Sequence, residues 1–135
     1  RIAIANARYF AAYRDCARLL EVVQQAAVVD DTFRDILVDL RRSHVDRVAR
    51  AIRRMQSEGI AARDLDAHTC AAALCGMVEG FARHWLGQGE EHDERLALDT
   101  LDALWIRALG IAAESAQGAG SNGRARVRHS DRSGG

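Results

Sequence analysis

The feature that most limits the fold of this chain is the regular spacing of its larger apolar residues. From Ile2 to about Val28 these residues recur every three or four positions, and a second series follows from Thr32 to near Gly59. An α-helix has about 3.6 residues per turn, so this spacing places the apolar side chains on one face of each helix. The sequence therefore predicts two long amphipathic helices. The apolar face of the first carries Ile2, Tyr9, Tyr13, Cys16, Leu20 and Val23, and that of the second carries Phe33, Leu37, Leu40, His44, Val48, Ile52 and Met55.

Polar residues mark the ends of these two helices. Asp30 and Asp31 interrupt the first periodic segment, and Thr32 with Asp35 three positions later resembles the capping box that begins a helix. Gly59 is expected to end the second helix, because glycine readily adopts the left-handed conformation found after a helix. The predicted second helix therefore extends from Thr32 to near Gly59.

Two further helices are predicted in the second half of the chain. Asp66 can accept a hydrogen bond from the first turn of a third helix, which extends to about Leu86. A run of acidic residues favours the start of a fourth helix near Glu90, because negative charge is stabilised at the N-terminal end of a helix dipole. This helix is expected to end at about Gly110. Its acidic run is Glu90, Glu91, Asp93 and Glu94, and its apolar stripe is Leu101, Leu104, Trp105, Ala108 and Leu109.

Composition agrees with a helical fold. The chain has no proline and its aromatic residues make up only 5% of the sequence, which favours long helices over β-strands. The 135 residues, of which 48% are hydrophobic, are enough for one core. The predicted fold is therefore all-α, an antiparallel bundle of about four long helices over residues 1–112. Glycine, serine and arginine replace large apolar residues further on, so residues 113–135 are predicted to be a disordered tail.

The predicted third helix is unusually apolar. From Ala71 to Val78 it presents apolar residues on nearly every side, which the surface of a monomer would leave exposed. We therefore expect two of its faces to have separate partners. Glu79 and Arg83 lie four positions apart on the same helix, and this spacing predicts an ion pair between them.

No group of residues predicts catalysis or a metal site. His68, Cys70 and Cys75 could suggest metal ligands, but a rotation of about 100° per residue on a helix points them in different directions. The dinucleotide-binding pattern of glycines within residues 118–123 lacks the strand and the helix between which it works. The sequence therefore predicts no enzyme, no catalytic residue, no metal and no cofactor.

Charge and cysteine content bear on partners and compartment. The 19 basic residues, all arginine, balance 19 acidic residues, so the formal net charge is zero. This balance does not favour nucleic acid or an anionic membrane as a direct partner. Three cysteines in a chain without a secretory signal or a membrane-spanning apolar run indicate the bacterial cytosol. The first residue, Arg1, is not methionine, which suggests that a segment precedes it.

Most of the few aromatic residues lie on the first three predicted helices. Large side chains can line a space between helices, and the hydroxyls of Tyr9 and Tyr13 would give such a space polar contacts. One interpretation is therefore a ligand pocket, and the other is that the aromatic side chains only fill the core. The sequence pattern leaves both open. The aromatic residues concerned are Tyr9, Phe10, Tyr13, Phe33, Phe81 and Trp85.

Three segments resemble the C-terminal effector-binding and dimerisation domain of TetR-type (TetR/AcrR) transcriptional regulators. Asn6–Arg14 resembles the first helix of that domain, and Leu74–Leu86 with Thr100–Gly110 resembles its closing pair of helices. The resemblance covers the chain from about Ile2 to Gly110. It implies that the closing helices pair with their copies in a second subunit as a four-helix bundle. The dimer-interface residues expected on this basis are Leu74, Val78, Trp85, Leu101, Leu104, Trp105 and Leu109.

The same resemblance implies a pocket for a small hydrophobic or amphipathic effector among the first three helices. Operator DNA would be bound only through an N-terminal helix-turn-helix, which is not in this chain, and the effector would relieve repression of transcription. The alternative function is a structural or protein-interaction bundle without a ligand. The candidate ligand-binding residues are Tyr9, Phe10, Tyr13, Phe33, Leu37, Leu40, His44, Met77 and Phe81.

Overall fold

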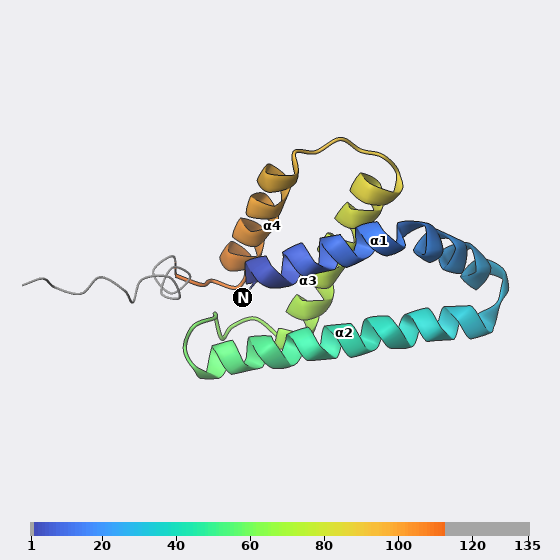
Figure 1. Ribbon diagram of the computed structural model, residues 1–135. Coiled ribbons are helices and arrows are strands. Elements are labelled where there is room, and N and C mark those ends of the chain that lie inside the picture. Colours follow the sequence, from blue (N-terminus) through green and yellow to red (C-terminus); the bar gives the residue numbers. More distant parts are fainter. Residues whose placement is uncertain (1, 113–135) are drawn as a thin grey trace, which may run out of the picture.

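Four α-helices and one short π-helix make up most of residues 2–112, the part of the chain that the computed structural model describes (Figure 1). Helix α1 comprises Ile2–Val29, α2 Asp31–Ser57, α3 Ala67–Ala82 and α4 Glu94–Ala108, and the π-helix η1 comprises Arg83–Gly87. Residues 2–112 contain no strand. The prediction of an all-α fold is therefore confirmed. Residues 113–135, predicted to be a disordered tail, lie outside the described residues.

The start of α2 differs from the prediction. Asp30 caps this helix, because its side chain accepts a hydrogen bond from the backbone N–H of Thr32 over 2.9 Å. Asp30 has extended backbone angles, φ −128° and ψ 113°, whereas Thr32 already lies inside the helix. The predicted capping box at Thr32 and Asp35 is therefore wrong, since an aspartate two positions earlier takes the capping role.

The other helix ends follow the sequence more closely. Asp66 caps α3 as predicted and accepts a hydrogen bond from the backbone of the first turn. Asp93 caps α4 in the same way, so Glu90 and Glu91 precede the helix instead of forming its first turn. Gly59 has a φ of +72°, the left-handed conformation expected after the end of α2.

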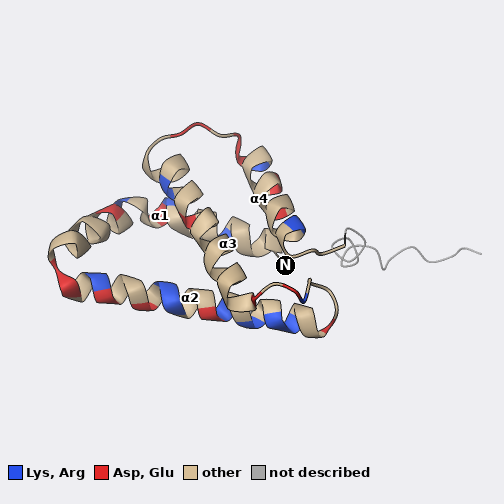
Figure 2. Cartoon of the chain, turned by 180° about the vertical axis from the view of Figure 1, so that it is seen from behind, with Lys and Arg blue, Asp and Glu red and all other residues tan. Residues whose placement is uncertain are grey.

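The helices surround one core. Helices α1 and α2 run antiparallel and are joined by Asp30 alone, α3 packs chiefly against α2, and α4 packs beside the start of α1 (Figure 1). The most deeply buried large side chains are Ile52 of α2 and Leu109, which follows α4. Acidic and basic residues are interspersed along the first half of α2, whereas the charged residues of its last eleven positions are all arginine (Figure 2). These exposed residues are Arg47, Arg50, Arg53 and Arg54.

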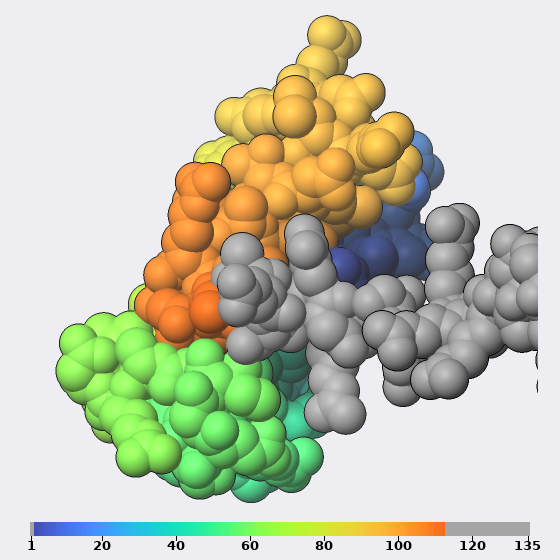
Figure 3. Space-filling model, turned by 90° about the vertical axis from the view of Figure 1, so that its left-hand side faces the viewer, coloured from blue at the N-terminus to red at the C-terminus, as the bar shows by residue number. Residues whose placement is uncertain are grey.

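Two polar contacts hold α4 in place. Asn6 of α1 is buried and donates a hydrogen bond from Nδ2 to Oδ1 of Asp102 over 2.7 Å. Directly after the C-terminal end of α4, the backbone oxygen of Leu109 accepts a hydrogen bond from Ala62 N–H over 2.8 Å. Figure 3 faces this end of the molecule and shows the end of α4, in orange, above the green segment that follows α2. Helix α4 is therefore tied both to α1 and to the loop after α2.

The apolar surface of α3 is largely covered within the chain itself. Helix α2 covers one side and α1 contacts another, and Met77 and Phe81 are half-buried against the core. The two faces of α3 that were expected to need separate partners therefore find them in α2 and α1 of the same chain. The buried residues of α3 are Ala67, Ala71, Leu74, Cys75, Val78 and Ala82.

The far ends of α1 and α2 extend beyond α3 as a hairpin tip, residues 19–40 (Figure 1). Eight of its larger apolar side chains are 40–87% exposed. The tip therefore presents more apolar surface than the rest of the described chain. The exposed residues are Leu19, Val22, Val28, Val29, Phe33, Ile36, Val38 and Leu40.

Candidate functional site

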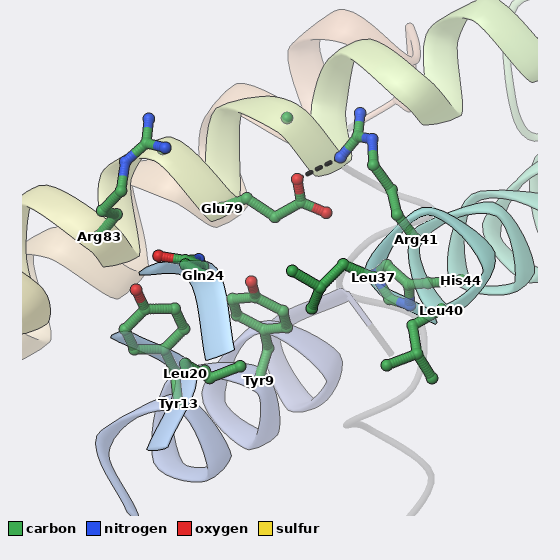
Figure 4. Close-up of a pocket in the computed structure, with 12 residues that line it drawn as sticks. Tyr9, Tyr13, Leu20, Gln24, Leu37, Leu40, Arg41, His44, Glu79 and Arg83 are labelled. Atoms are coloured by element: carbon green, nitrogen blue, oxygen red, sulfur yellow. Dashed lines mark hydrogen bonds and ion pairs between the residues drawn. The ribbon is translucent and has the colours of Figure 1, made fainter. Parts of the chain in front are cut away.

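A cavity of about 420 Å³ lies between α1, α2 and α3. Small-molecule sites usually have volumes of about 300–1,000 Å³. Figure 4 shows that leucine side chains, two tyrosine hydroxyls and an ion pair meet around this space. The lining residues are Tyr9, Tyr13, Leu20, Gln24, Leu37, Leu40, Arg41, His44, Gly76, Glu79, Gly80 and Arg83.

Helical spacing brings these residues to one place. On α1 they are separated by four, seven and four positions. On α2 they are the first, fourth, fifth and eighth residues of the segment 37–44. The lining residues of α3 and η1 hold the same four places in the segment 76–83. Such positions share one face of a helix. Gly80 adds space, because a Cβ atom at this position would have no neighbouring heavy atom within 4 Å.

Tyr9 and Tyr13 give the cavity two hydrogen-bonding groups. Their hydroxyls point toward α3 (Figure 4), and neither hydroxyl makes a hydrogen bond within residues 2–112. Burial, with a smaller contribution from the charge of Glu79, raises the pKa of Tyr9 to about 12. The Tyr9 hydroxyl therefore stays protonated near neutral pH and can donate a hydrogen bond. Its ring stacks on the imidazole of His44, with ring centroids 6.2 Å apart.

An ion pair between Arg41 of α2 and Glu79 of α3 forms part of the cavity wall (Figure 4). Arg41 also donates a hydrogen bond to the backbone oxygen of Ala72 over 3.2 Å. Arg41 thus ties α2 to α3 at two points. The predicted ion pair between Glu79 and Arg83 is wrong, because the guanidinium of Arg41 on the neighbouring helix reaches the Glu79 carboxylate.

A smaller cleft of about 100 Å³ continues from the cavity toward η1. It shares Tyr13, Gln24 and Arg83 with the cavity. π-Helical turns are rare and occur frequently at functional sites, and here η1 supplies Arg83 and Gly87 to the cleft. The cleft is completed by Ala17, Glu21 and Gln88.

One protein-family model matches almost all of the described chain. The family described as transcriptional regulator EthR, C-terminal domain, matches residues 2–110. The chain belongs to this family. It is the C-terminal domain of a TetR-family regulator, so the resemblance inferred from the sequence is confirmed. No curated protein and no solved structure matches the chain.

Five of the nine candidate ligand-binding residues line the cavity of this EthR-type domain, namely Tyr9, Tyr13, Leu37, Leu40 and His44. The other four lie elsewhere. Phe10 is buried in the core and packs edge to face against Phe81, and Met77 is half-buried against the same core. Phe33 is 40% exposed at the hairpin tip. Ligand contact by any of the nine residues stays a prediction.

Sequence reasoning missed seven residues that line the cavity of the EthR-type domain. Helical spacing could have found some of them, because Arg41 lies four positions after Leu37 and Gly80 lies four positions after Gly76. No sequence signal marks Gln24 or Arg83 as facing the cavity. The seven residues are Leu20, Gln24, Arg41, Gly76, Glu79, Gly80 and Arg83.

Six of the seven predicted dimer-interface residues are buried inside the EthR-type domain itself. Each of the six is at most 9% exposed, whereas Leu104 is 43% exposed. Leu104 belongs to the α4 outer face, which we define as Leu96, Thr100, Leu104 and Ala108, four exposed residues spaced by four positions. The predicted interface therefore has one exposed member, and a role of the others in dimerisation stays a prediction. The six buried residues are Leu74, Val78, Trp85, Leu101, Trp105 and Leu109.

The cysteines and histidines of the EthR-type domain do not converge. Within residues 2–112, no three His, Cys, Asp or Glu side chains are placed to hold a metal ion. His68 instead faces Asp46 at 3.6 Å. None of the helices described is both long enough and apolar enough to cross a membrane. The glycine pattern at residues 118–123 lies outside the described residues.

Proposed function

We propose that this domain binds a small apolar or amphipathic effector between α1, α2 and α3 and forms a homodimer, as the ligand-sensing half of a TetR-type transcriptional repressor. The cavity carries this proposal. A bundle that served only as a scaffold would be more stable with these helices closed together, because the lining leucines would then be removed from water. Here Gly80 leaves the wall open, and two tyrosine hydroxyls face the space without a hydrogen-bond partner among residues 2–112. These features favour a ligand over the alternative of a purely structural bundle.

The proposed dimer forms through the α4 outer face. Its support is the exposure of Leu96, at 67%, and of Leu104, at 43%, on one side of a helix whose other side is buried in the core. Two copies of this face would cover each other's leucines in a symmetric contact. The bundle of closing helices that the family resemblance implies also involves α4.

Regulation would follow from differential binding. Operator DNA would be bound by an N-terminal helix-turn-helix outside this chain, and its half-site spacing would depend on the arrangement of the dimer. An effector that binds one arrangement better than the other shifts the population toward it and so changes the affinity for DNA. The proposed role involves no turnover and no cofactor, and its setting is the bacterial cytosol.

Native mass spectrometry of the purified chain tests both parts of the proposal. We expect a dimer that retains a small molecule from the expression host or binds an added apolar probe. The variant Gly80→Leu should lose the bound mass and remain a dimer, because the new side chain occupies the cavity and not the α4 outer face. The matched control is Ala73→Leu, which introduces the same side chain at an exposed position of α3.

Each part of the proposal has its own contrary result. A monomer at all protein concentrations would contradict the dimer. A dimer that neither retains a molecule nor binds apolar probes would contradict the sensing role. Equal loss of ligand in Gly80→Leu and Ala73→Leu would show that the cavity is not the binding site.

A further inference from the structure

We propose that the effector is an amphiphile with one negative charge, a carboxylate. Arg83 and Tyr13 bind this head group at the η1 end of the cavity, and the apolar body contacts Leu37 and Leu40 of α2. This inference rests on the proposed function and names the chemical class of its ligand. Its support is the one unpaired charge of the cavity lining, the hydroxyl beside that charge, and the position of the apolar wall across the cavity.

The cavity lining carries one unpaired positive charge. With histidine counted as neutral, its charged side chains are Arg41, Glu79 and Arg83. Arg41 and Glu79 form an ion pair, and the Glu79 carboxylate is directed at Arg41 and away from Arg83 (Figure 4). The side chain of Arg83 makes no ion pair and no hydrogen bond within residues 2–112. Because an arginine stays protonated in proteins, a bound anion can neutralise this charge.

One further acidic residue, Glu21 of α1, lines the smaller cleft together with Arg83. Glu21 is not part of the cavity lining, and it forms no ion pair with Arg83 in the described part of the chain. Both residues are exposed, so water screens the attraction between them. An anion in the cavity would therefore meet Arg83 without first displacing a protein carboxylate.

The Tyr13 hydroxyl lies close to the base of the Arg83 side chain. A Cβ atom at Gly87 of η1 would lie 3.6 Å from Tyr13 Oη and 3.9 Å from Arg83 Cγ. Tyr13 and Arg83 therefore approach the same point, one from α1 and the other from η1. The Tyr13 hydroxyl makes no hydrogen bond among the residues described and can donate one to a ligand. A guanidinium and a hydroxyl donor match a carboxylate, because its two oxygens only accept hydrogen bonds.

The apolar wall of the cavity lies across from Arg83. Tyr9 of α1 stacks on His44 of α2, and the two helices run antiparallel. Four positions further along α1 and four positions earlier on α2, Tyr13 and Leu40 therefore lie at the same level. Figure 4 shows Arg83 on one side of the cavity and the leucines of α2 on the opposite side. A ligand that crosses the cavity thus has its charge at η1 and its apolar body against α2, where it is removed from water.

The test compares three probes with the same alkyl chain length and different head groups: octanoate, octanamide and octylamine. Isothermal titration calorimetry on the full chain, near neutral pH and at low salt, should show octanoate binding about fivefold tighter than octanamide, the size expected of one partly exposed ion pair, and octylamine binding most weakly. The preference should shrink in about 1 M NaCl, where charges are screened beyond about 3 Å. Octanamide or octylamine binding as tightly as octanoate at low salt would overturn the inference, as would a preference that high salt does not reduce.

Variants of Arg83 locate the head group. Arg83→Gln removes the charge, so octanoate should bind no tighter than octanamide. Arg83→Glu should make octylamine the tightest probe, a reversal that a purely structural role of Arg83 would not produce. The matched control is Arg47→Gln, which removes an exposed arginine of α2 that lies outside the cavity lining and has no ion pair within the described residues, and it should keep the original order. If Arg83→Gln keeps the preference for octanoate, the inference is wrong.

Failure of the inference and failure of the proposed function give different results. If all three probes bind equally and Gly80→Leu abolishes their binding, the cavity is a binding site and the inference about charge is wrong. If no probe binds at its solubility limit, both the inference and the sensing role fail. Thermal unfolding identifies any variant that is not folded. In place of an unfolded Arg83 variant, Tyr13→Phe should weaken octanoate more than octanamide, because a hydrogen bond to a charged acceptor is the stronger one, and equal weakening would overturn the inference.

Discussion

Gly80 shows how much one residue contributes to the shape of the site. It lies within α3, where glycine is less favourable than alanine by about 0.5–1 kcal/mol, because its unfolded chain is more flexible. The position of its absent Cβ is open space at the cavity wall. Glycine at this position therefore lowers the stability of α3 and keeps the cavity open.

A first prediction follows for Gly80→Ala. This variant should raise the free energy of unfolding by about 0.5–1 kcal/mol, because the added methyl group meets no neighbour and the unfolded chain loses freedom. Urea unfolding followed by circular dichroism measures the change. Gly59→Ala should have the opposite effect, because the φ of +72° there strains any residue with a Cβ. A loss of stability in Gly80→Ala would show that the wall is more crowded than described.

A second prediction concerns the three thiols. Cys16 is exposed and Cys75 is buried. Burial, with a smaller contribution from Glu79, raises the pKa of Cys75 to about 11, and burial also raises that of Cys70. Because only the thiolate reacts, iodoacetamide should label Cys16 first and Cys75 last. Mass spectrometry of peptides from a labelling time course gives the order, and early labelling of Cys75 would contradict its burial.

Helices and their caps can be predicted from the sequence more fully than the contacts between helices. Helical periodicity found all four α-helices because each must bury an apolar stripe, and Asp66 and Gly59 were found because capping is local chemistry. The start of α2 was misplaced because two acidic residues and a threonine compete for one capping position, and only backbone angles decide between them.

Tertiary contacts were predicted less well. The partner of Glu79 was assigned within α3, but Arg41 reaches it from α2 because the two helices lie side by side. Phe33 was placed at the pocket since it shares a face with Leu37, yet α2 extends beyond α3 there and leaves it at the hairpin tip. Helical spacing gives the face of a residue, whereas the point at which a neighbouring helix ends depends on the whole fold.

A third prediction belongs to the α3 cap. Hydrogen bonds from Thr69 hold the pKa of Asp66 below its ordinary value of 3.8. A carboxyl whose pKa is lowered by folding stabilises the fold above its unfolded pKa, and this contribution is lost as the pH falls through the folded pKa. Asp66→Asn keeps an oxygen acceptor without the charge. Its melting temperature should therefore be lower than that of the unmodified chain near neutral pH and converge with it in acid. If the difference in melting temperature persists at low pH, it comes from the geometry of the cap and not from the charge of Asp66.

At the scale of the whole molecule, burial decides which residues can test the dimer. Trp105 is only 9% exposed, so Trp105→Arg would place a charge in the core and should unfold the chain. Leu104 is 43% exposed on the α4 outer face and can be changed without disturbing the core.

A fourth prediction follows for Leu104→Arg. Light scattering should show a monomer, because two arginines would meet across the symmetric contact, and circular dichroism should show unchanged helix content. Leu65→Arg, at an exposed position in the loop before α3, is the matched control and should remain a dimer. If Leu104→Arg remains a folded dimer, the subunit contact does not lie at the α4 outer face.

Helix α1 takes part in three of the regions described above. One uninterrupted segment of 28 residues meets α4 at Asn6, lines the cavity between Tyr9 and Gln24, and continues to the hairpin tip. If α1 moved as a rigid rod held at Asn6, it would act as a lever with its pivot there. If a guest molecule changes the tilt of α1 by a small angle, each residue is displaced in proportion to its distance from the pivot. The cavity wall would then move little and the hairpin tip would move most. A small adjustment of α1 to a bound molecule would thus become a larger displacement at the surface of the tip.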